Sequence, residues 1–235
     1  MRKLAYVALA AVLAQAALGG ITVLFFLPTA ISVSHAGLAQ LFLALVVALA
    51  VVTSRFWLSG RVAVDGADAH AVVGLATAST LMIYLQILIG AVMRHKGAGL
   101  AIPDFPLVFG GLIPPKLDFA IGIHYTHRIG ALLVATLIFW TLGRTLRLAR
   151  VEPALTRPAS LMACLVLMQG VLGGLVVWTS KAVLPNTLHV GTGGLLLATS
   201  VVLTLASRRL SWLAEGHRAQ APSTVEVLEV EQATT

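Results

Sequence analysis

The sequence predicts an all-α fold, namely a polytopic membrane helical bundle with six transmembrane helices. Of the 235 residues, 58% are hydrophobic and only 11% are charged, whereas soluble globular proteins carry about 25% charged residues. The hydrophobic residues gather in six runs of about 20 residues, which is the length of helix that crosses a bilayer. The basic residues lie between these runs, so membrane topology explains a pI near 10.3 better than nucleic-acid binding does.

The six runs follow one another with short connections, except in one place. We expect helices over Leu4–Leu27, Ile31–Val52, Ala71–Met93, Phe119–Leu142, Ala159–Trp178 and Leu184–Ala206. Segment 94–118 between the third and fourth runs is rich in Gly and Pro, which argues against one continuous helix. Its apolar residues predict that it lies against the outer membrane surface or covers a site. The polar end of the chain, 209–235, is expected to be a disordered cytoplasmic tail.

The basic residues also predict how the spans are oriented. One set of loops and ends holds Arg2, Lys3, Arg55, Arg61, Arg144, Arg147, Arg150, Arg157, Arg208, Arg209 and Arg218. The opposite set holds only Arg94, Lys96, Lys116 and Lys181. Cytoplasmic loops of membrane proteins carry the excess of Lys and Arg. We therefore expect a multi-pass protein of the cell membrane with both termini in the cytoplasm.

The first two runs resemble a copy of the last two. A shift of 154 residues, without a gap, aligns Gln15 with Gln169, Gly19 and Gly20 with Gly173 and Gly174, and His35 with His189. Chance matches of leucine are common in apolar sequence, but a Gln, a Gly-Gly pair and a His in one register are not. We therefore divide the chain into half of one pseudo-symmetric unit at 1–55, a complete four-helix unit at 71–208, and the tail at 209–235.

Four histidines, His35, His124, His127 and His189, lie inside predicted spans, where an ionisable residue is costly and indicates a function. Three of them, His35, His127 and His189, lie within roughly 6–12 Å of the outer ends of their helices at the usual rise per residue. His127 and His189 can therefore face each other within one unit, as two axial ligands of a haem iron do. Hydrogen bonding between helices is the alternative explanation for each histidine taken singly.

Other kinds of metal site are less well supported by the sequence. The single cysteine, Cys164, lies within an apolar run, so covalent c-type haem attachment and a cysteine zinc site have no support. A zinc or copper site built from the histidines ranks below haem, because no cysteine or close carboxylate completes a tetrahedral set.

Residues beside His127 suggest further contacts to a haem. His124 shares the helix face of His127, and Arg128 follows it directly. A buried arginine needs an anion, and a haem propionate is one candidate. Gly130 and the glycines at 191, 193 and 194 would let a flat macrocycle approach the backbone. Helix packing through small residues explains these glycines equally well.

Several motifs together resemble the haem A synthase family. They are Leu85–Arg94, Gly97–Leu107, His124–Arg128, Gln169–Gly174 and Pro185–His189, and the resemblance covers about residues 1–208. It implies two pseudo-symmetric four-helix halves and the oxidation of the methyl group of haem O to the formyl group of haem A, for terminal oxidases. It further implies a haem b between His127 and His189, and His35 as one of two histidines that hold the substrate haem.

The chain departs from the family pattern at its start. It begins at what would be the third helix, so the first two helices are expected to be absent, with their histidine and the glutamate to which catalysis is attributed. His124 stands where the retained motif would hold that glutamate. Three explanations remain open: a misplaced start, a two-helix partner or second copy that supplies the missing helices, or a chain that only binds haem b. The catalytic residues therefore stay unknown.

The preferred interpretation is a haem A synthase-like membrane oxidoreductase with haem b as cofactor and haem O as substrate. It needs a redox partner, since the glycine-rich stretches lie inside apolar helices and form no flavin or nicotinamide fingerprint. One alternative is a haem b protein for electron transfer or an accessory role, without substrate oxidation. Another is a small transporter or assembly protein, supported only by the helical repeat.

Overall fold

The computed structural model describes residues 2–59, 66–147 and 153–220, with the backbone alone at 66–69 and 214–220. Its named elements are all helical: α1 (Arg2–Leu24), α2 (Thr29–Val52), α3 (Arg55–Leu58), α4 (Gly66–His95), the 3-10 turn η1 (Ala98–Leu100), α5 (Phe119–Arg147), α6 (Pro153–Trp178) and α7 (Val183–Gln220). Six of these helices are long and apolar enough to cross a membrane. The predicted helical membrane bundle with six spans is confirmed.

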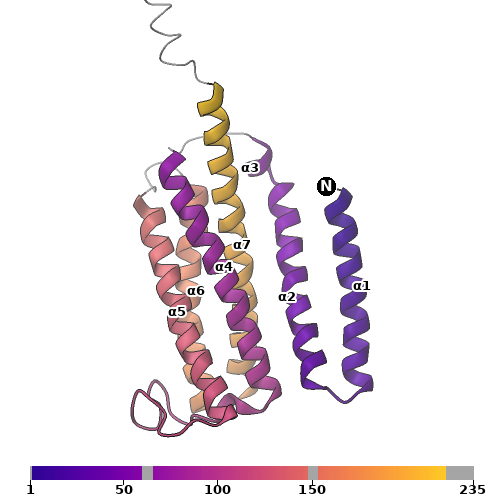
Figure 1. Cartoon of the computed structure of the whole chain (residues 1–235), viewed down its shortest axis with the longest axis vertical. Helices are drawn as coiled ribbons and strands as arrows, with labels where there is room; N and C mark the ends of the chain where they lie inside the picture. Colours follow the sequence, from indigo (N-terminus) through magenta and orange to yellow (C-terminus); the bar gives the residue numbers. More distant parts are fainter. Residues whose placement is uncertain (1, 60–65, 148–152, 221–235) are drawn as a thin grey trace, which may run out of the picture.

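The long helices lie side by side, and α2 packs between α1 on one side and α4 and α7 on the other (Figure 1). Helices α4, α5, α6 and α7 form a cluster in which neighbours in the sequence are also neighbours in space. Three connections, 25–28, 96–118 and 179–182, lie at the same end of the bundle, at the bottom of Figure 1. We call this the histidine end, because His35, His127 and His189 lie in the first turns of the helices that start there.

The apolar core lies among α4, α5, α6 and α7. Ile83, Ile138, Met162 and Leu197, one from each helix, are at most 2% exposed. In contrast, α1 and α2 bury only small residues, namely Thr22, Ser32 and Gly37. Their large apolar side chains are exposed or half-buried, as expected for helices that face lipid on one side.

A glycine allows α2 to approach α4 closely. A Cβ atom on Gly37 would lie only 2.9 Å from Cδ2 of Leu88. The hydroxyl of Tyr84 on α4 donates to the carbonyl oxygen of Gly37 over 3.4 Å. Small residues are favoured at helix contacts in membranes because they let backbones approach, so Gly37 allows the close contact between α2 and α4.

Several helices are longer than the sequence predicted. Helix α6 begins at Pro153 instead of Ala159, and proline suits the first position of a helix because its missing N–H has no helical partner there. Helix α7 continues to Gln220, so part 209–220 of the expected tail is helical, while 221–235 lie outside the described residues.

Arg209 joins this part of α7 to the short helix α3. Its guanidinium carbon lies 5.4 Å from the ring centre of Trp57 and 5.0 Å from that of Trp212. Its Nε also donates to the carbonyl oxygen of Trp57 over 3.1 Å. The short helix α3, which the sequence did not predict, is thereby joined to α7; Ser54 caps it by accepting from the backbone N–H of Trp57.

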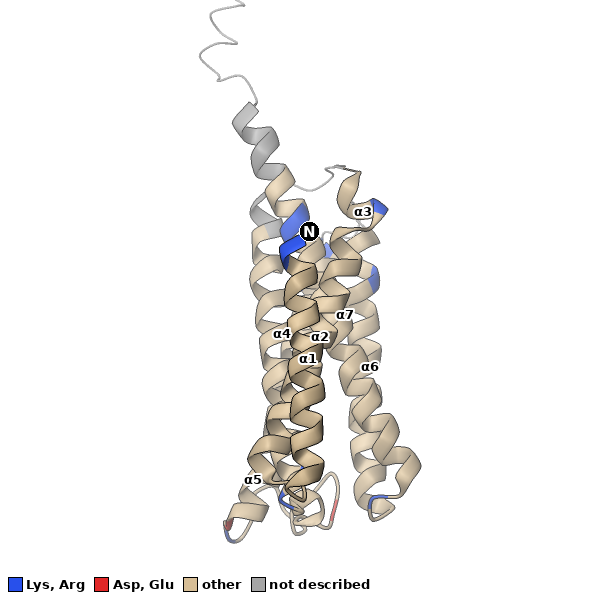
Figure 2. Cartoon of the chain, turned by 90° about the vertical axis from the view of Figure 1, so that its right-hand side faces the viewer, with Lys and Arg blue, Asp and Glu red and all other residues tan. Residues whose placement is uncertain are grey.

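Lysines and arginines lie toward the two ends of the helices, and the lengths of the helices are largely free of charge (Figure 2). The described cations at the histidine end include Arg94, Lys96 and Lys181, and those at the opposite end include Arg2 and Arg144. This is the charge distribution that a bilayer requires of a bundle that crosses it.

Candidate functional site

The rings of His127 and His189 face each other across the four-helix cluster. Their centres are 6.5 Å apart, and the ring planes are inclined by 72°. A metal ion bonded to one nitrogen of each ring, at the usual length of about 2 Å, would lie about 3 Å from each ring centre. Two axial imidazoles would then be about 6 Å apart between centres. The observed separation therefore fits a single iron held between the two rings.

A glutamine and a glycine of α4 surround His127. The side-chain nitrogen of Gln86 donates to the backbone oxygen of His127 over 2.6 Å and lies 3.0 Å from its Nδ1. A Cβ atom on Gly90, one turn along the same face of α4, would lie 3.0 Å from Cε1 of His127. The ring therefore occupies the space that a side chain at position 90 would need.

His189 has the same kind of surroundings on α6. The side-chain nitrogen of Gln169 donates to the backbone oxygen of His189 over 2.8 Å. A Cβ atom on Gly173 would lie 3.5 Å from Cε1 of the ring. The Nδ1 atom of His189 is buried without a hydrogen-bond partner in the described structure. A buried ring nitrogen without a partner is costly, and this one is a candidate to bind a ligand.

His35 lies apart from this pair, against α1. The side-chain nitrogen of Gln15 donates to the backbone oxygen of His35 over 3.1 Å and lies 3.4 Å from Nε2. A Cβ atom on Gly19 would lie 3.1 Å from Cε1, and Nδ1 is buried without a partner among the described residues.

The same local arrangement therefore occurs three times. The sequence comparison found two copies, Gln15/Gly19 and Gln169/Gly173, through their common shift. It did not reveal that Gln86 and Gly90 form a third copy. In that copy 41 residues separate the glutamine from its histidine, whereas 20 residues separate them in the other two copies. The signal that would have found it is a glutamine followed four residues later by a glycine.

His124 and Arg128 anchor the long connection at the histidine end. The guanidinium of Arg128 donates to the backbone oxygens of Ile102, Asp104 and Leu107 over 3.2, 2.7 and 2.7 Å. The backbone N–H of Ile102 donates to Nδ1 of His124, and Nε of Arg128 lies 3.2 Å from Nε2 of that ring. A neutral imidazole has one acceptor nitrogen, so His124 accepts from one of these donors at a time.

The connection is thus held to the bundle by backbone contacts, and Ile102 and Val108 are buried in it. The expected contacts of Arg128 with a haem propionate and of His124 with the haem stay predictions; in the described structure the two side chains contact the connection and each other.

An aromatic contact holds the other side of this connection. The rings of Phe105 and Trp178 meet edge to face with their centres 5.8 Å apart, and Nε1 of Trp178 donates to the backbone oxygen of Phe105. A Cβ atom on Gly174 would lie 2.8 Å from Cδ1 of Phe105. Gly174 directly follows the glycine that faces His189, so this part of the connection packs against the helix that carries that glycine; that the connection covers a site stays a prediction.

Asp104 orders the outer part of this connection. Its carboxylate accepts from the backbone N–H groups of Gly110 and Phe109 over 2.7 and 2.8 Å. The hydrogen bond from Gly110 contributes most to holding the pKa of Asp104 below its ordinary value, and the charge of Arg128 adds to it. Hydrogen bonds from N–H groups favour the charged form of a carboxyl group.

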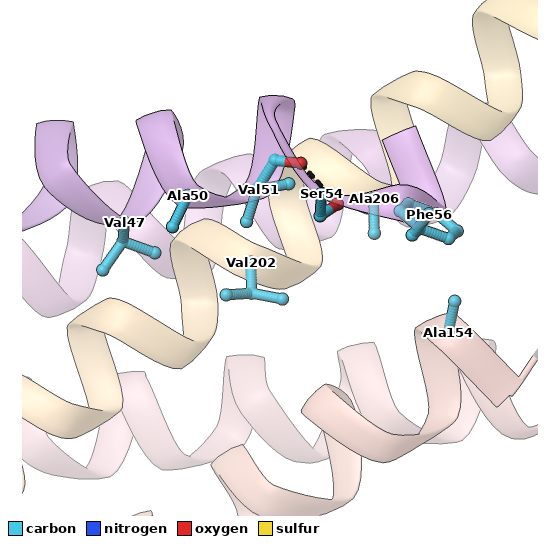
Figure 3. Close-up of a pocket in the computed structure, with 8 residues that line it drawn as sticks. All are labelled: Val47, Ala50, Val51, Ser54, Phe56, Ala154, Val202 and Ala206. Atoms are coloured by element: carbon cyan, nitrogen blue, oxygen red, sulfur yellow. Dashed lines mark hydrogen bonds between the residues drawn. The ribbon is translucent and has the colours of Figure 1, made fainter. Parts of the chain in front are cut away.

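An apolar cavity lies elsewhere in the bundle. A cavity of about 440 Å³ lies between α2, α3, α6 and α7, and apolar side chains such as Val51 and Val202 line it (Figure 3). It is about 20 Å along α7 from His189, by the rise of a helix. The polar residue in its lining, Ser54, donates to the backbone oxygen of Val51. None of the residues that line this cavity has an acidic, basic or thiol side chain.

The described residues also contain no group of three or more His, Cys, Asp or Glu side chains placed to hold a metal ion. A zinc or copper site made by this chain alone requires such a group. A haem iron does not, since the porphyrin supplies four of its ligands and the protein only the axial ones.

Comparison with known proteins identifies the family. The model of the COX15-CtaA family, described as cytochrome oxidase assembly protein, matches residues 1–201. The chain belongs to this family. The resemblance to haem A synthases seen in the sequence is thereby confirmed.

Several relatives of this chain are named haem A synthase. One from Symbiobacterium thermophilum is 42% identical over 74 residues, covering 30% of this chain and 22% of the relative. One from Shouchella clausii is 36% identical over 101 residues, covering 43% and 34%. One from Bacillus cereus (strain G9842) is 30% identical over 110 residues, covering 47% and 35%. The match to each of these relatives thus spans at most about a third of its length.

Proposed function

We propose that this chain is a haem A synthase-type membrane oxidoreductase that holds a haem b between His127 and His189. The observation that carries the proposal is the pair of facing rings, 6.5 Å apart between centres. The glycines at 90 and 173 leave room for these rings, and the buried Nδ1 of His189 has no partner among the described residues. Membership of the COX15-CtaA family and the names of the relatives support the same assignment.

The activity that we propose is the oxidation of the methyl group of haem O to the formyl group of haem A. This is a net oxidation by four electrons that takes one oxygen atom from water and releases four protons, so a redox partner must accept the four electrons. A bis-histidine haem b supplies a one-electron carrier when bound. His127 and His189 would hold this haem, and His35 would hold the substrate haem. His124 and Arg128 would hold the connection that closes the site and contact propionates.

We also propose the division into half a unit at 1–55 and a four-helix unit at 71–208. The equal spacing of Gln15 and Gln169 from their histidines supports this division. The excess of cations at the end opposite the histidines supports cytoplasmic termini in the cell membrane. Assembly of a terminal oxidase is the process that would use the product.

The first experiment is the optical spectrum and extracted-haem analysis of the detergent-purified full chain. His127→Ala and His189→Ala are compared with the control His95→Ala, which changes an exposed histidine at the same end. We expect a low-spin haem spectrum that both site variants lose and the control keeps. A spectrum that survives His127→Ala and His189→Ala together would refute the proposed ligands.

A specific observation favours one alternative, a haem b protein for electron transfer or an accessory role. In the described part of the chain, the contact between histidine rings is the one between His127 and His189, whereas His35 contacts a glutamine and a glycine. Incubating the haem-loaded protein with haem O and an electron acceptor distinguishes the two. Formation of formyl haem supports the synthase, and its absence with an intact haem b spectrum supports the alternative.

A further inference from the structure

We infer that Gln15, Gln86 and Gln169 are positioning residues, each of which fixes the depth of one histidine by binding the backbone oxygen of that histidine. The inference rests on the proposed haem site, and it extends it to residues that do not themselves contact a metal. It concerns Gln86 and Gln169 most directly, because they serve the facing pair.

The first support is the identity of the acceptor. In all three copies the glutamine nitrogen donates to the backbone oxygen of the histidine itself, and not to that of a neighbour. A carbonyl oxygen in a helix accepts one bond from the helix and has a second lone pair available. A donor on the neighbouring helix that binds there sets the height of the histidine relative to that helix.

The second support is that the chain connection does not impose this geometry. His35 and His189 follow their glutamines by 20 residues across a short turn, whereas His127 follows Gln86 by 41 residues across the long connection. Two different connections produce the same contact. The contact therefore depends on the glutamine and on the glycine one turn away, which leaves space for the ring.

Simple helix adhesion is the competing explanation, since polar side chains join helices in membranes. The described structure contains such bonds elsewhere: Ser79 pairs with Thr141, and Thr80 with Thr204, between hydroxyl groups 3.1 and 2.9 Å apart. Neither involves a histidine. The glutamine contact, in contrast, recurs at His35, His127 and His189, which adhesion alone does not require.

The two members of the facing pair are held differently. The nitrogen of Gln86 contacts both the backbone oxygen and the ring Nδ1 of His127, whereas Gln169 contacts only the backbone oxygen of His189. The ring of His127 is thus fixed in rotation as well as in depth. Loss of Gln86 is therefore expected to affect the site more than loss of Gln169.

Gly130 offers a way to move Gln86 without changing any hydrogen-bonding group. A Cβ atom at position 130 would overlap Oε1 of Gln86, so Gly130→Ala pushes the amide away from His127. On the same helix, nothing lies within 4 Å of a Cβ atom at Gly122, so Gly122→Ala is a matched control.

The experiment uses the full chain in detergent with added haem b. Gln86→Met and Gln169→Met keep side-chain length and remove the donor, and Thr80→Val removes an ordinary bond from the same helix as Gln86. We expect haem affinity to fall roughly 10- to 100-fold in Gln86→Met, as for other residues that orient metal ligands. The fall should be smaller in Gln169→Met and Gly130→Ala, and absent in Thr80→Val and Gly122→Ala. Wild-type affinity and spectra in both methionine variants would overturn the inference.

A measurement on the haem-free protein separates this inference from the proposed function. With ¹⁵N-labelled histidine, we expect the ring-nitrogen resonances of His127 to shift in Gln86→Met and to stay in place in Thr80→Val. Unchanged resonances in Gln86→Met would overturn the positioning role even if haem binds. A shift in a protein that takes up no haem would support the positioning role while refuting the haem site.

Discussion

At the scale of single residues, the candidate site depends on glycines, which have no side chain, as much as on the histidines themselves. Gly90 and Gly173 stand where a Cβ atom would meet a histidine ring, at 3.0 and 3.5 Å respectively. A contact of 3.5 Å is an ordinary van der Waals distance, whereas 3.0 Å forces a shift. Position 90 should therefore tolerate a side chain less well than position 173.

The first prediction concerns Gly90→Val. The branched side chain would occupy the place of the His127 ring, so we expect haem occupancy to fall severalfold while the helices remain folded. The control is Gly74→Val on the same helix, where a Cβ atom meets nothing within 4 Å. Haem per protein and helical circular dichroism are measured for both. Equal haem content in the two variants would contradict the geometry.

The second prediction concerns pH and Asp104. The folded pKa of this carboxyl group is lowered by hydrogen bonds from Gly110 and Phe109. Its contribution to the order of the connection is therefore complete above its ordinary pKa, about 3.9. That contribution is lost as the pH falls through the lower folded value. Hydrogen exchange at residues 105–112, corrected for intrinsic rates, should lose protection below about pH 4. In Asp104→Ala, protection should already be low at pH 6 and depend less on pH.

At the scale of elements, α7 combines a buried and a lipid-facing side. Leu203 is fully buried among the helices of the four-helix cluster, whereas Leu195 is 50% exposed on the same helix. Helices in a bilayer are held together largely by van der Waals packing, since lipid is as apolar as the helix surface. Burial against protein, and not hydrophobicity, therefore decides which leucines contribute to stability.

The third prediction follows from that difference. Leu203→Ala leaves a cavity and should destabilise the bundle by about 2–5 kcal/mol, whereas Leu195→Ala should change stability little. Thermal unfolding in one detergent, followed by circular dichroism, compares the two. If both variants unfolded at the same temperature as the wild type, this result would contradict the burial of Leu203 in the core.

At the scale of the whole molecule, the three connections at the histidine end and the cation-rich opposite end predict the orientation in the membrane. The fourth prediction uses single cysteines in a Cys164→Ser background. Lys116→Cys should react with a membrane-impermeant thiol reagent in intact cells, because it lies at the histidine end. Ser59→Cys, exposed at the other end, should react only after the membrane is permeabilised. The reverse pattern would invert the proposed topology.

The six spans could be predicted from the sequence, because apolar runs of that length form helices across a bilayer. The sequence also predicted that His35, His127 and His189 lie near the same end of the bundle, since the depth of a residue in a helix follows from its position along that helix. The common register of Gln15 and Gln169 was visible too, because the two copies have connections of equal length.

Which side chains meet could not be predicted without the packing of the helices. Gln86 is matched to His127 across 41 residues, and no local pattern specifies how so long a connection returns to the bundle. The guanidinium of Arg128 contacts three backbone oxygens of that connection, where the sequence suggested an anion. Contacts of this kind depend on how helices rotate and approach, which is set by packing over the whole molecule and not by the residues on either side.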